Sequence, residues 1–241
     1  MKAPWFFVAL ALCGCKSLSS IRCPETRPGN RGYIVGGPRV SPVEPVVPAP
    51  KDFDALIRAA QAAAATAEND PQPAKRIEAA KRGILAAHQA RELQPERVEG
   101  HYWYALNVGL LADADRAYGL NAVTEMEAAL KRAAELDERY DYAGPLRVLG
   151  ILLLRTPAPP VSIGSPRKGL RLLQRAVELF PDYPENYLYL GEALRETGRT
   201  GEAKSVWQKG RALPAPADRQ AEATRWQQEF DRLLKSVSNP C

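Results

Sequence analysis

One stretch decides the fold of this chain, Pro184 to Pro214, whose sequence is PENYLYLGEALRETGRTGEAKSVWQKGRALP. On a first helix it places an aromatic residue, a Leu-Gly pair and a further leucine, namely Tyr187, Leu190, Gly191 and Leu194. On a second helix it places a small residue, a tryptophan and a glycine, followed by proline, namely Ala203, Trp207, Gly210 and Pro214. Small residues let two antiparallel helices approach closely, while the large ones fill the spaces between neighbours. Gly198 is expected to end the first helix in the left-handed conformation.

This spacing resembles the tetratricopeptide repeat (TPR), a helical hairpin that stacks into solenoids. The preceding unit keeps the same register with Leu149-Gly150 and Leu153, then Gly169, Leu173 and Ala176. Gly150 and Gly169 are 19 positions apart, whereas Gly191 and Ala203 are 12 positions apart. The additional residues include four prolines, and rigid exposed insertions of this kind are commonly binding elements or oligomer contacts.

Helical periodicity begins at Phe53. Apolar residues recur at i, i+3, i+4, i+7 and i+11 in a first helix that is expected to end near Asn69: Phe53, Leu56, Ile57, Ala60 and Ala64. A final helix from about Ala217 to Val237 carries Trp226 and Phe230 on one face. We predict an all-α domain over residues 52–238, a right-handed α-solenoid of about four TPR-like helix pairs plus a C-terminal capping helix, and a tail at 239–241.

The amino terminus has the pattern of a bacterial lipoprotein signal over residues 1–14. Lys2 precedes a short apolar run that ends in Leu12-Cys13-Gly14-Cys15, which resembles a lipobox. Cys15 is the predicted lipidation site, because acylation of Cys13 would put the bulky Leu12 at the cleavage position. Two acyl chains suffice for stable membrane attachment. Plain secretory cleavage nearby stays open as the alternative.

Residues 15–51 are predicted to form a flexible tether after the acylated cysteine. Prolines and glycines recur throughout this segment, which favours extended polyproline-II conformation over helix. Cys23 in the tether and Cys241 at the last position could pair in an oxidising compartment, or both could be free thiols.

Composition excludes several classes of function. The net charge is +5, and basic and acidic residues alternate along the predicted helices, which indicates a solvated surface and no nucleic-acid partner. The sequence lacks a phosphate-binding glycine loop, a His-Glu-x-x-His motif and a Gly-x-Ser-x-Gly elbow, and it contains two histidines. We expect a non-catalytic protein with no cofactor, no catalytic residue and no metal site.

Four features between Ala74 and Val237 carry a family resemblance. They are the string His101-Tyr-Trp-Tyr-Ala-Leu, a long helix ending Ala133-Ala-Glu-Leu-Asp, the Val148-Leu-Gly repeat with its proline-containing insertion, and the Trp207 repeat. Together they resemble the T component of tripartite ATP-independent periplasmic (TRAP) transporters and the related regulator of microtubule dynamics family. The first resemblance implies a helical lipoprotein that acts with a periplasmic solute-binding protein and encloses a channel or pocket for an apolar ligand.

If the fold is a solenoid, residues of each first helix that do not point into the core line a concave groove for a partner or ligand. In this register they are Tyr104, Val108, Leu111, Arg147, Ile151, Arg155, Leu188, Glu192 and Arg195. Apolar residues bracketed by arginines suit an amphipathic ligand or a peptide carboxylate. The alternative is that the apolar members are ordinary core and the arginines a solvated rim.

Three functions follow from these observations: a scaffold for envelope proteins, a transporter accessory that handles a small apolar or amphipathic solute, and a structural subunit of a larger machine. The expected partners are envelope proteins, including a periplasmic solute-binding protein, the membrane through the N-terminal lipid, and further copies of the chain in a homo-oligomer. The expected location is the bacterial cell envelope, on the outer membrane facing the periplasm.

Overall fold

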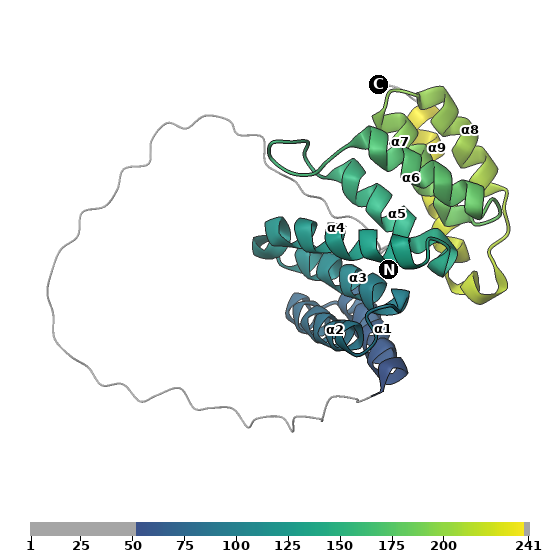
Figure 1. Ribbon diagram of the computed structural model, residues 1–241. Helices are drawn as coiled ribbons and strands as arrows, with labels where there is room; N and C mark the ends of the chain where they lie inside the picture. The colour runs from purple at the N-terminus through teal and green to yellow at the C-terminus, as the bar shows by residue number, and fades with distance from the viewer. Residues whose placement is uncertain (1–51, 239–241) are drawn as a thin grey trace, which may run out of the picture. The chain divides into compact units, whose positions relative to one another are not determined.

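The computed structural model describes residues 52–238, and all of the regular structure in that range is helical (Figure 1). The elements are α1 Phe53–Asn69, α2 Pro73–Leu93, α3 Val98–Ala114, η1 Arg116–Tyr118, α4 Gly119–Leu136, α5 Tyr140–Arg155, α6 Pro166–Leu179, α7 Pro184–Glu196, α8 Thr200–Arg211, η2 Ala217–Glu222 and α9 Ala223–Ser238. The predicted signal segment 1–14, the tether 15–51, the tail 239–241 and Cys15, Cys23 and Cys241 lie outside the described residues.

The helices pack as four antiparallel pairs and a final helix. Each of α1 to α8 contacts the next α-helix along the chain, and the first helices of the pairs, α1, α3, α5 and α7, also contact one another in series. The second helices α2, α4, α6 and α8 make no such contacts with each other in residues 52–238. The first helices therefore form one continuous inner wall. The arrangement confirms the predicted all-α solenoid of about four TPR-like pairs with a helix at its C-terminal end.

The first helix shows how local sequence sets these elements. Asp52 begins α1, because its carboxylate accepts a hydrogen bond from the backbone amide of Ala55 at 3.0 Å. The predicted apolar stripe is buried along its whole length, from Phe53 at 2% exposure to Ala64 at 1%. The helix ends at Asn69 as predicted, directly before Asp70 and Pro71.

The α7/α8 pair shows the close approach expected from Gly191 and Trp207. A Cβ atom on Gly191 would lie 2.1 Å from Trp207 Nε1, so the indole occupies the space that a side chain would need. Trp207 is fully buried and donates from Nε1 to the carbonyl of Leu188 at 2.9 Å. Gly198 has φ +80° after the end of α7, as the left-handed cap requires.

Residues 156–165 form the predicted insertion between α5 and α6. Its two ends are tied together, since Gly164 donates to the carbonyl of Pro157 at 2.8 Å and Ser165 to that of Leu153 at 2.7 Å. Val161 near its tip is 67% exposed. The insertion therefore projects from the α5/α6 pair as a tethered loop (Figure 1).

The C-terminal segment departs from the predicted single helix between Ala217 and Val237. Residues 217–222 form the 3₁₀ helix η2, with Arg219 outside helical geometry at φ −125° and ψ 23°, and the α-helix begins only at Ala223. The prediction of a continuous helix from Ala217 was wrong for these six residues. No helix in the described range is both long and apolar enough to span a bilayer.

Candidate functional site

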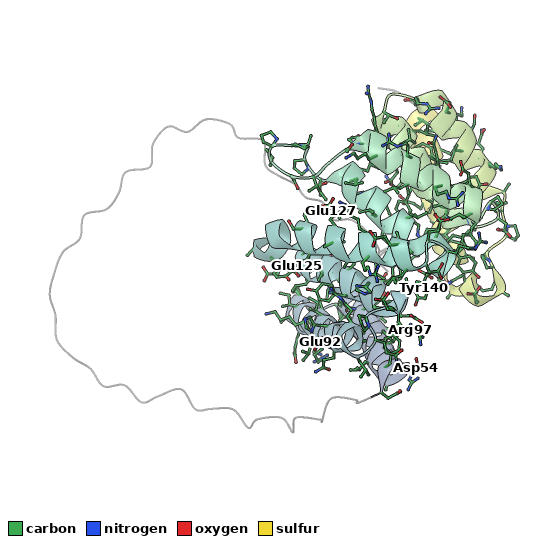
Figure 2. All side chains as sticks on the ribbon, viewed as in Figure 1. Asp54, Glu92, Arg97, Glu125, Glu127 and Tyr140 are labelled. Carbon is green, nitrogen blue, oxygen red and sulfur yellow. The ribbon has the colours of Figure 1, made fainter. Side chains whose placement is uncertain are left out.

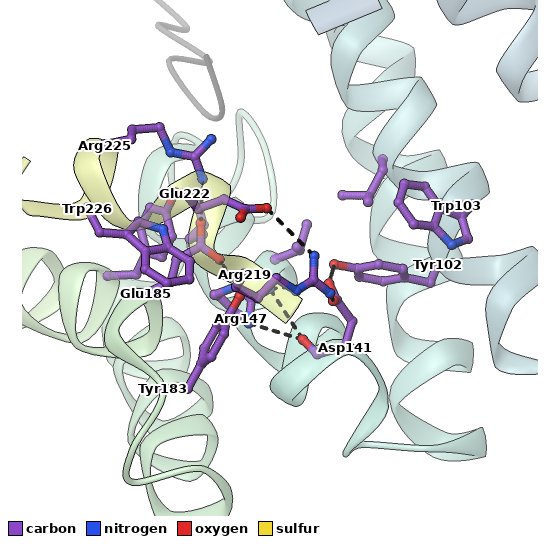
Figure 3. Close-up of a pocket in the computed structure, with 14 residues that line it drawn as sticks. Tyr102, Trp103, Asp141, Arg147, Tyr183, Glu185, Arg219, Glu222, Arg225 and Trp226 are labelled. Atoms are coloured by element: carbon purple, nitrogen blue, oxygen red, sulfur yellow. Dashed lines mark hydrogen bonds and ion pairs between the residues drawn. The ribbon is translucent and has the colours of Figure 1, made fainter. Parts of the chain in front are cut away.

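A cavity of about 100 Å³ lies where the inner wall meets the C-terminal segment (Figure 3). Helices α3, α5 and α7 form its wall, and η2 with the start of α9 closes it. The charged residues that line it are Asp141, Arg147, Glu185, Arg219, Glu222 and Arg225, and the aromatic residues are Tyr102, Trp103, Tyr183, Tyr189 and Trp226. The site is thus both charged and aromatic.

One wall of the cavity begins with an unusual turn at the start of α5. Asp141, Tyr142 and Ala143 are all left-handed, with φ of 49°, 55° and 64°. Non-glycine residues in this conformation cost about 1–3 kcal/mol each and persist only where surrounding contacts fix them. Backbone strain of this size is found at functional sites, and here it places the Asp141 side chain at the cavity.

Arg147 supplies the contacts that fix this turn. Its Nη1 donates to the Tyr142 carbonyl at 3.0 Å and to Asn186 Oδ1 at 3.1 Å, and Asn186 Nδ2 in turn donates to the Tyr142 carbonyl at 3.2 Å. Ion pairs join Arg147 to Asp141 at 3.4 Å and to Glu185 at 3.3 Å. A buried guanidinium thus holds α5, its left-handed turn and α7 together.

Arg147 stays a cation although it is only 5% exposed. Burial alone would lower its pKa, but the charge of Glu185, supported by Tyr183, Tyr102 and Asp141, raises the pKa above the ordinary arginine value. The Arg147 guanidinium also lies over the Tyr183 ring, 5.3 Å from the ring centre. The charge is therefore balanced within the protein.

The C-terminal segment closes the cavity through polar contacts. Arg219 donates to Asp141, which also accepts a hydrogen bond from the hydroxyl of Tyr102 at 2.5 Å. The hydroxyl of Tyr142 donates to Asp218 at 2.7 Å. No residue of η2 is buried, so these contacts, together with those of α9, hold this part of the segment in place.

Arg225, near the start of α9, connects the closing segment to the first helix pair. Its guanidinium lies 3.6 Å from Glu185 and 3.9 Å from Glu68 at the end of α1. The Glu68 side chain is 5% exposed. Burial raises its pKa from 4.5 to about 8, against the opposing effect of Arg225, so Glu68 is mostly protonated at neutral pH.

Three polar atoms at the cavity wall are buried without a hydrogen-bond partner: Arg219 Nε, Glu222 Oε2 and Trp226 Nε1. The Glu222 carboxylate points across the cavity toward Arg219, and its Oε1 lies 3.9 Å from Arg219 Nη1, beyond hydrogen-bond distance (Figure 3). Buried polar groups in proteins are usually hydrogen-bonded, and exceptions mark sites that water or a ligand completes.

A family model described as TRAP transporter T-component matches residues 54–189, more than half of the chain. The chain belongs to the TRAP transporter T-component family. This confirms the first of the two family resemblances predicted from the sequence. The match covers Tyr102, Arg147 and Glu185 and ends within α7, before the segment of η2 and α9 that carries Arg219, Glu222 and Trp226.

The chain is similar to two solved structures. A thermophilic TPR protein of Thermus thermophilus is 18% identical with a TM-score of 0.50, over 76% of this chain and 91% of that chain. The MamA protein is 17% identical with a TM-score of 0.41, over 73% of this chain and 87% of that chain. A comparison with curated proteins gave no match. The likeness to the thermophilic protein confirms the TPR-like architecture of this T-component family member.

The structure brings two of the nine predicted groove residues, Arg147 and Ile151, to the cavity wall. Val108, Leu111 and Leu188 pack instead in apolar clusters, each at most 5% exposed. None of these three lines the cavity.

The charged members of the predicted groove lie in pairs with other side chains. Arg155 donates to Glu192 at 2.8 Å and lies over the ring of Tyr189. The Arg195 guanidinium lies over Trp207, with its Nη2 3.6 Å from Glu196. The role of these residues as a partner groove stays a prediction.

Tyr104 belongs to a separate cluster around Glu125, which is labelled in Figure 2. Glu125 accepts hydrogen bonds from the hydroxyls of Tyr104 at 2.9 Å and Tyr118 at 3.0 Å. Arg91 lies over the Tyr104 ring at 4.5 Å from its centre. Glu127, two residues along α4, pairs with Lys131 instead, so the two glutamates face different partners.

Sequence reasoning missed most of the charged cavity residues, above all Asp141, Glu185 and Glu222. Helical periodicity marks core positions and says little about polar residues that meet across the inner wall. One available signal was Gly144-Pro145, since proline disfavours α conformation in the residue before it. Within residues 52–238 no group of three His, Cys, Asp or Glu side chains is placed to hold a metal ion.

Proposed function

We propose that this protein is a non-catalytic accessory subunit of a TRAP-type solute transport system, acting at the bacterial envelope with a periplasmic solute-binding protein. The observation that carries the proposal is the position of the cavity. Its wall on α3, α5 and α7 belongs to the part of the chain that matches the T-component family, so the shared fold builds a site where a solute fits.

The chemistry of the cavity supports binding over catalysis. Asp141, Arg147 and Arg219 bond to one another and to the strained turn, so these charged groups serve to shape the wall. A rigid wall of mutually bonded groups with a few unpartnered atoms is the arrangement of a solute-recognition site. The polar lining favours a polar solute over the apolar one that the family resemblance implied.

The anchoring half of the proposal concerns residues outside the described range. Acylation of Cys15 would hold the helical domain near the membrane at the end of the tether, on the periplasmic side. The variant Cys15→Ser removes the acylated thiol and leaves residues 52–238 unchanged. We expect the native chain in the membrane fraction with the mass of a lipidated N-terminus, and the variant in the aqueous fraction. A variant that stays in the membrane fraction would refute lipid anchoring.

Partner capture tests the transport role. The full chain, tagged at its C-terminus, is purified from its native host in gentle detergent, and the proteins that accompany it are identified by mass spectrometry. We expect one periplasmic solute-binding protein as the main partner. The Cys15→Ser variant is the matched control, because a partner that binds the helical domain is still captured after the anchor is lost.

A second candidate function is a scaffold for several envelope proteins, and the loop at residues 156–165 favours it. This loop projects from the solenoid with its ends hydrogen-bonded and with Val161 exposed, and exposed loops on a rigid scaffold commonly carry binding contacts. Capture of many unrelated envelope proteins with no solute-binding protein would support the scaffold and refute the transport role. A large stoichiometric complex without a solute-binding protein would instead indicate a structural subunit. Self-association of the chain stays a prediction, which the mass of the purified protein in solution tests.

A further inference from the structure

Two polar atoms on the segment that closes the cavity, η2 with the start of α9, have no hydrogen-bond partner, and one is a donor and the other an acceptor. Trp226 Nε1 is a hydrogen-bond donor on a residue that is 2% exposed, and Glu222 Oε2 is an acceptor on a buried carboxylate oxygen. Both residues line the cavity. Glu222 is the last residue of η2 and Trp226 lies in the first turn of α9, so two adjoining elements bring the two side chains to the cavity. A single molecule in the cavity can therefore meet both if it carries an acceptor at one end and a donor at the other.

The surrounding charges decide what kind of donor suits Glu222. Arg147 and Arg219 are already bonded to Asp141, and the Arg219 Nη1 nearest to Glu222 is 3.9 Å away. Glu222 Oε2 thus has no hydrogen-bond partner, and Oε1 lies beyond hydrogen-bond distance from Arg219 Nη1. A cationic N–H donor forms the strongest hydrogen bond with such a group.

The aromatic lining favours the same cation. Trp103 and Trp226 line the cavity together with Glu222. The rings of Tyr183 and Tyr189 also line it, but guanidinium groups of Arg147 and Arg155 already lie over them. Ammonium groups are attracted to the faces of aromatic rings, most strongly to tryptophan. At the other end, Trp226 Nε1 and Arg219 Nε are donors without a hydrogen-bond partner, and Arg219 Nε lies 3.5 Å from Asp218 Oδ2 in an ion pair. Both N–H groups suit the oxygens of a carboxylate.

The volume limits the size of the molecule. An apolar cavity of about 150 Å³ accommodates benzene, with six carbon atoms. The present cavity of about 100 Å³ is smaller and therefore suits a compact molecule of about four or five non-hydrogen atoms. A short amino acid has this size and carries both an ammonium and a carboxylate group.

We propose that the cavity binds a small zwitterionic amino acid, with its ammonium group at Glu222 and its carboxylate at Trp226 Nε1 and Arg219 Nε. This inference rests on the proposed function, since it names the solute that the accessory subunit handles. It gives the closing segment, which lies outside the family match, the part of the site that selects the solute.

Calorimetric titration of the purified full chain tests the proposal. Glycine, L-alanine and β-alanine are the zwitterionic probes, propionate lacks the ammonium group, and isopropylamine lacks the carboxylate. We expect at least one zwitterion to bind, and propionate and isopropylamine to bind at least about tenfold more weakly. Glu222→Gln and Trp226→Phe should each weaken binding of the zwitterion by about tenfold or more.

The matched control is Glu229→Gln, which makes the same chemical change on α9 at a residue paired with Arg232. It should leave the affinity unchanged. Circular dichroism checks that each variant is folded, and Glu222→Gln alone decides the question if Trp226→Phe does not fold. Absence of binding by all three zwitterions, equal binding of propionate, or an unchanged affinity in Glu222→Gln would overturn the proposal.

The titration uses the isolated chain, so its outcome is separate from partner capture. Zwitterion binding without a captured solute-binding protein would refute the transport role and leave the site assignment standing. Capture of that partner without zwitterion binding would refute the site assignment alone.

Discussion

Replacing Arg147 with methionine tests whether the buried guanidinium holds the inner wall together. Methionine keeps much of the length and loses the charge. The two shortest bonds of Arg147, to the Tyr142 carbonyl at 3.0 Å and Asn186 Oδ1 at 3.1 Å, each join a charged donor to a neutral acceptor. Bonds of this type contribute about 1.5–3 kcal/mol each. The change also leaves Asp141 and Glu185 without a buried cation, and breaking a buried ion pair typically costs about 3–5 kcal/mol.

We expect the free energy of unfolding of Arg147→Met to fall by about 3–5 kcal/mol. Urea unfolding followed by far-ultraviolet circular dichroism measures it, and a denaturant slope of about 2 kcal/mol per M gives a midpoint lower by about 2 M. The control is Arg167→Met on the exposed surface of α6, which should change stability by at most about 0.5 kcal/mol. A loss in Arg147→Met below about 1 kcal/mol would refute the reasoning, because the network would then contribute no more than a surface contact.

Two further predictions concern packing and pH. A Cβ on Gly169 would lie 2.6 Å from the Gly150 carbonyl oxygen, so Gly169→Ala should force α5 and α6 apart and lower stability by about 1–3 kcal/mol in urea unfolding. A Cβ on Gly201 would meet no atom within 4 Å, so Gly201→Ala should be neutral or stabilising by up to about 1 kcal/mol in the same experiment. Equal losses of stability in the two variants would contradict the packing argument. Glu68, with its pKa raised from 4.5 to about 8 by burial, holds its proton more tightly in the folded state. Its contribution to stability is complete below about pH 4.5 and declines as the pH rises to about 8. Wild type should therefore lose melting temperature relative to Glu68→Gln between about pH 5 and about pH 9, and a constant difference would refute the shift.

The helix pairs could be predicted because their determinants are local. Gly191 and Trp207 lie 16 positions apart, and one TPR-like spacing fixes both the small residue and the ring that fills the space beside it. The apolar stripe from Phe53 to Ala64 likewise follows from helical periodicity alone. Sequence patterns of this kind report which face of a helix is buried.

The cavity could be predicted only in part, because its contacts join distant segments. Arg147 and Ile151 were placed on the inner wall by register, but the bond from Arg219 to Asp141 joins residues 78 positions apart. Residues 217–222 contain neither proline nor glycine, so no local signal marks the break at Arg219. That residue leaves helical geometry where its side chain bonds to Asp141.

The cavity is lined by two separate stretches of chain, one inside the family match and one beyond it. The repeats through Tyr189 form the common framework, whereas Glu222 and Trp226 come from a short terminal segment beyond it. On the proposed solute site, grafting another relative's terminal segment onto this framework would therefore change the solute that is bound and leave the framework unaltered. Selectivity in such proteins could diversify by exchange of one end of the polypeptide.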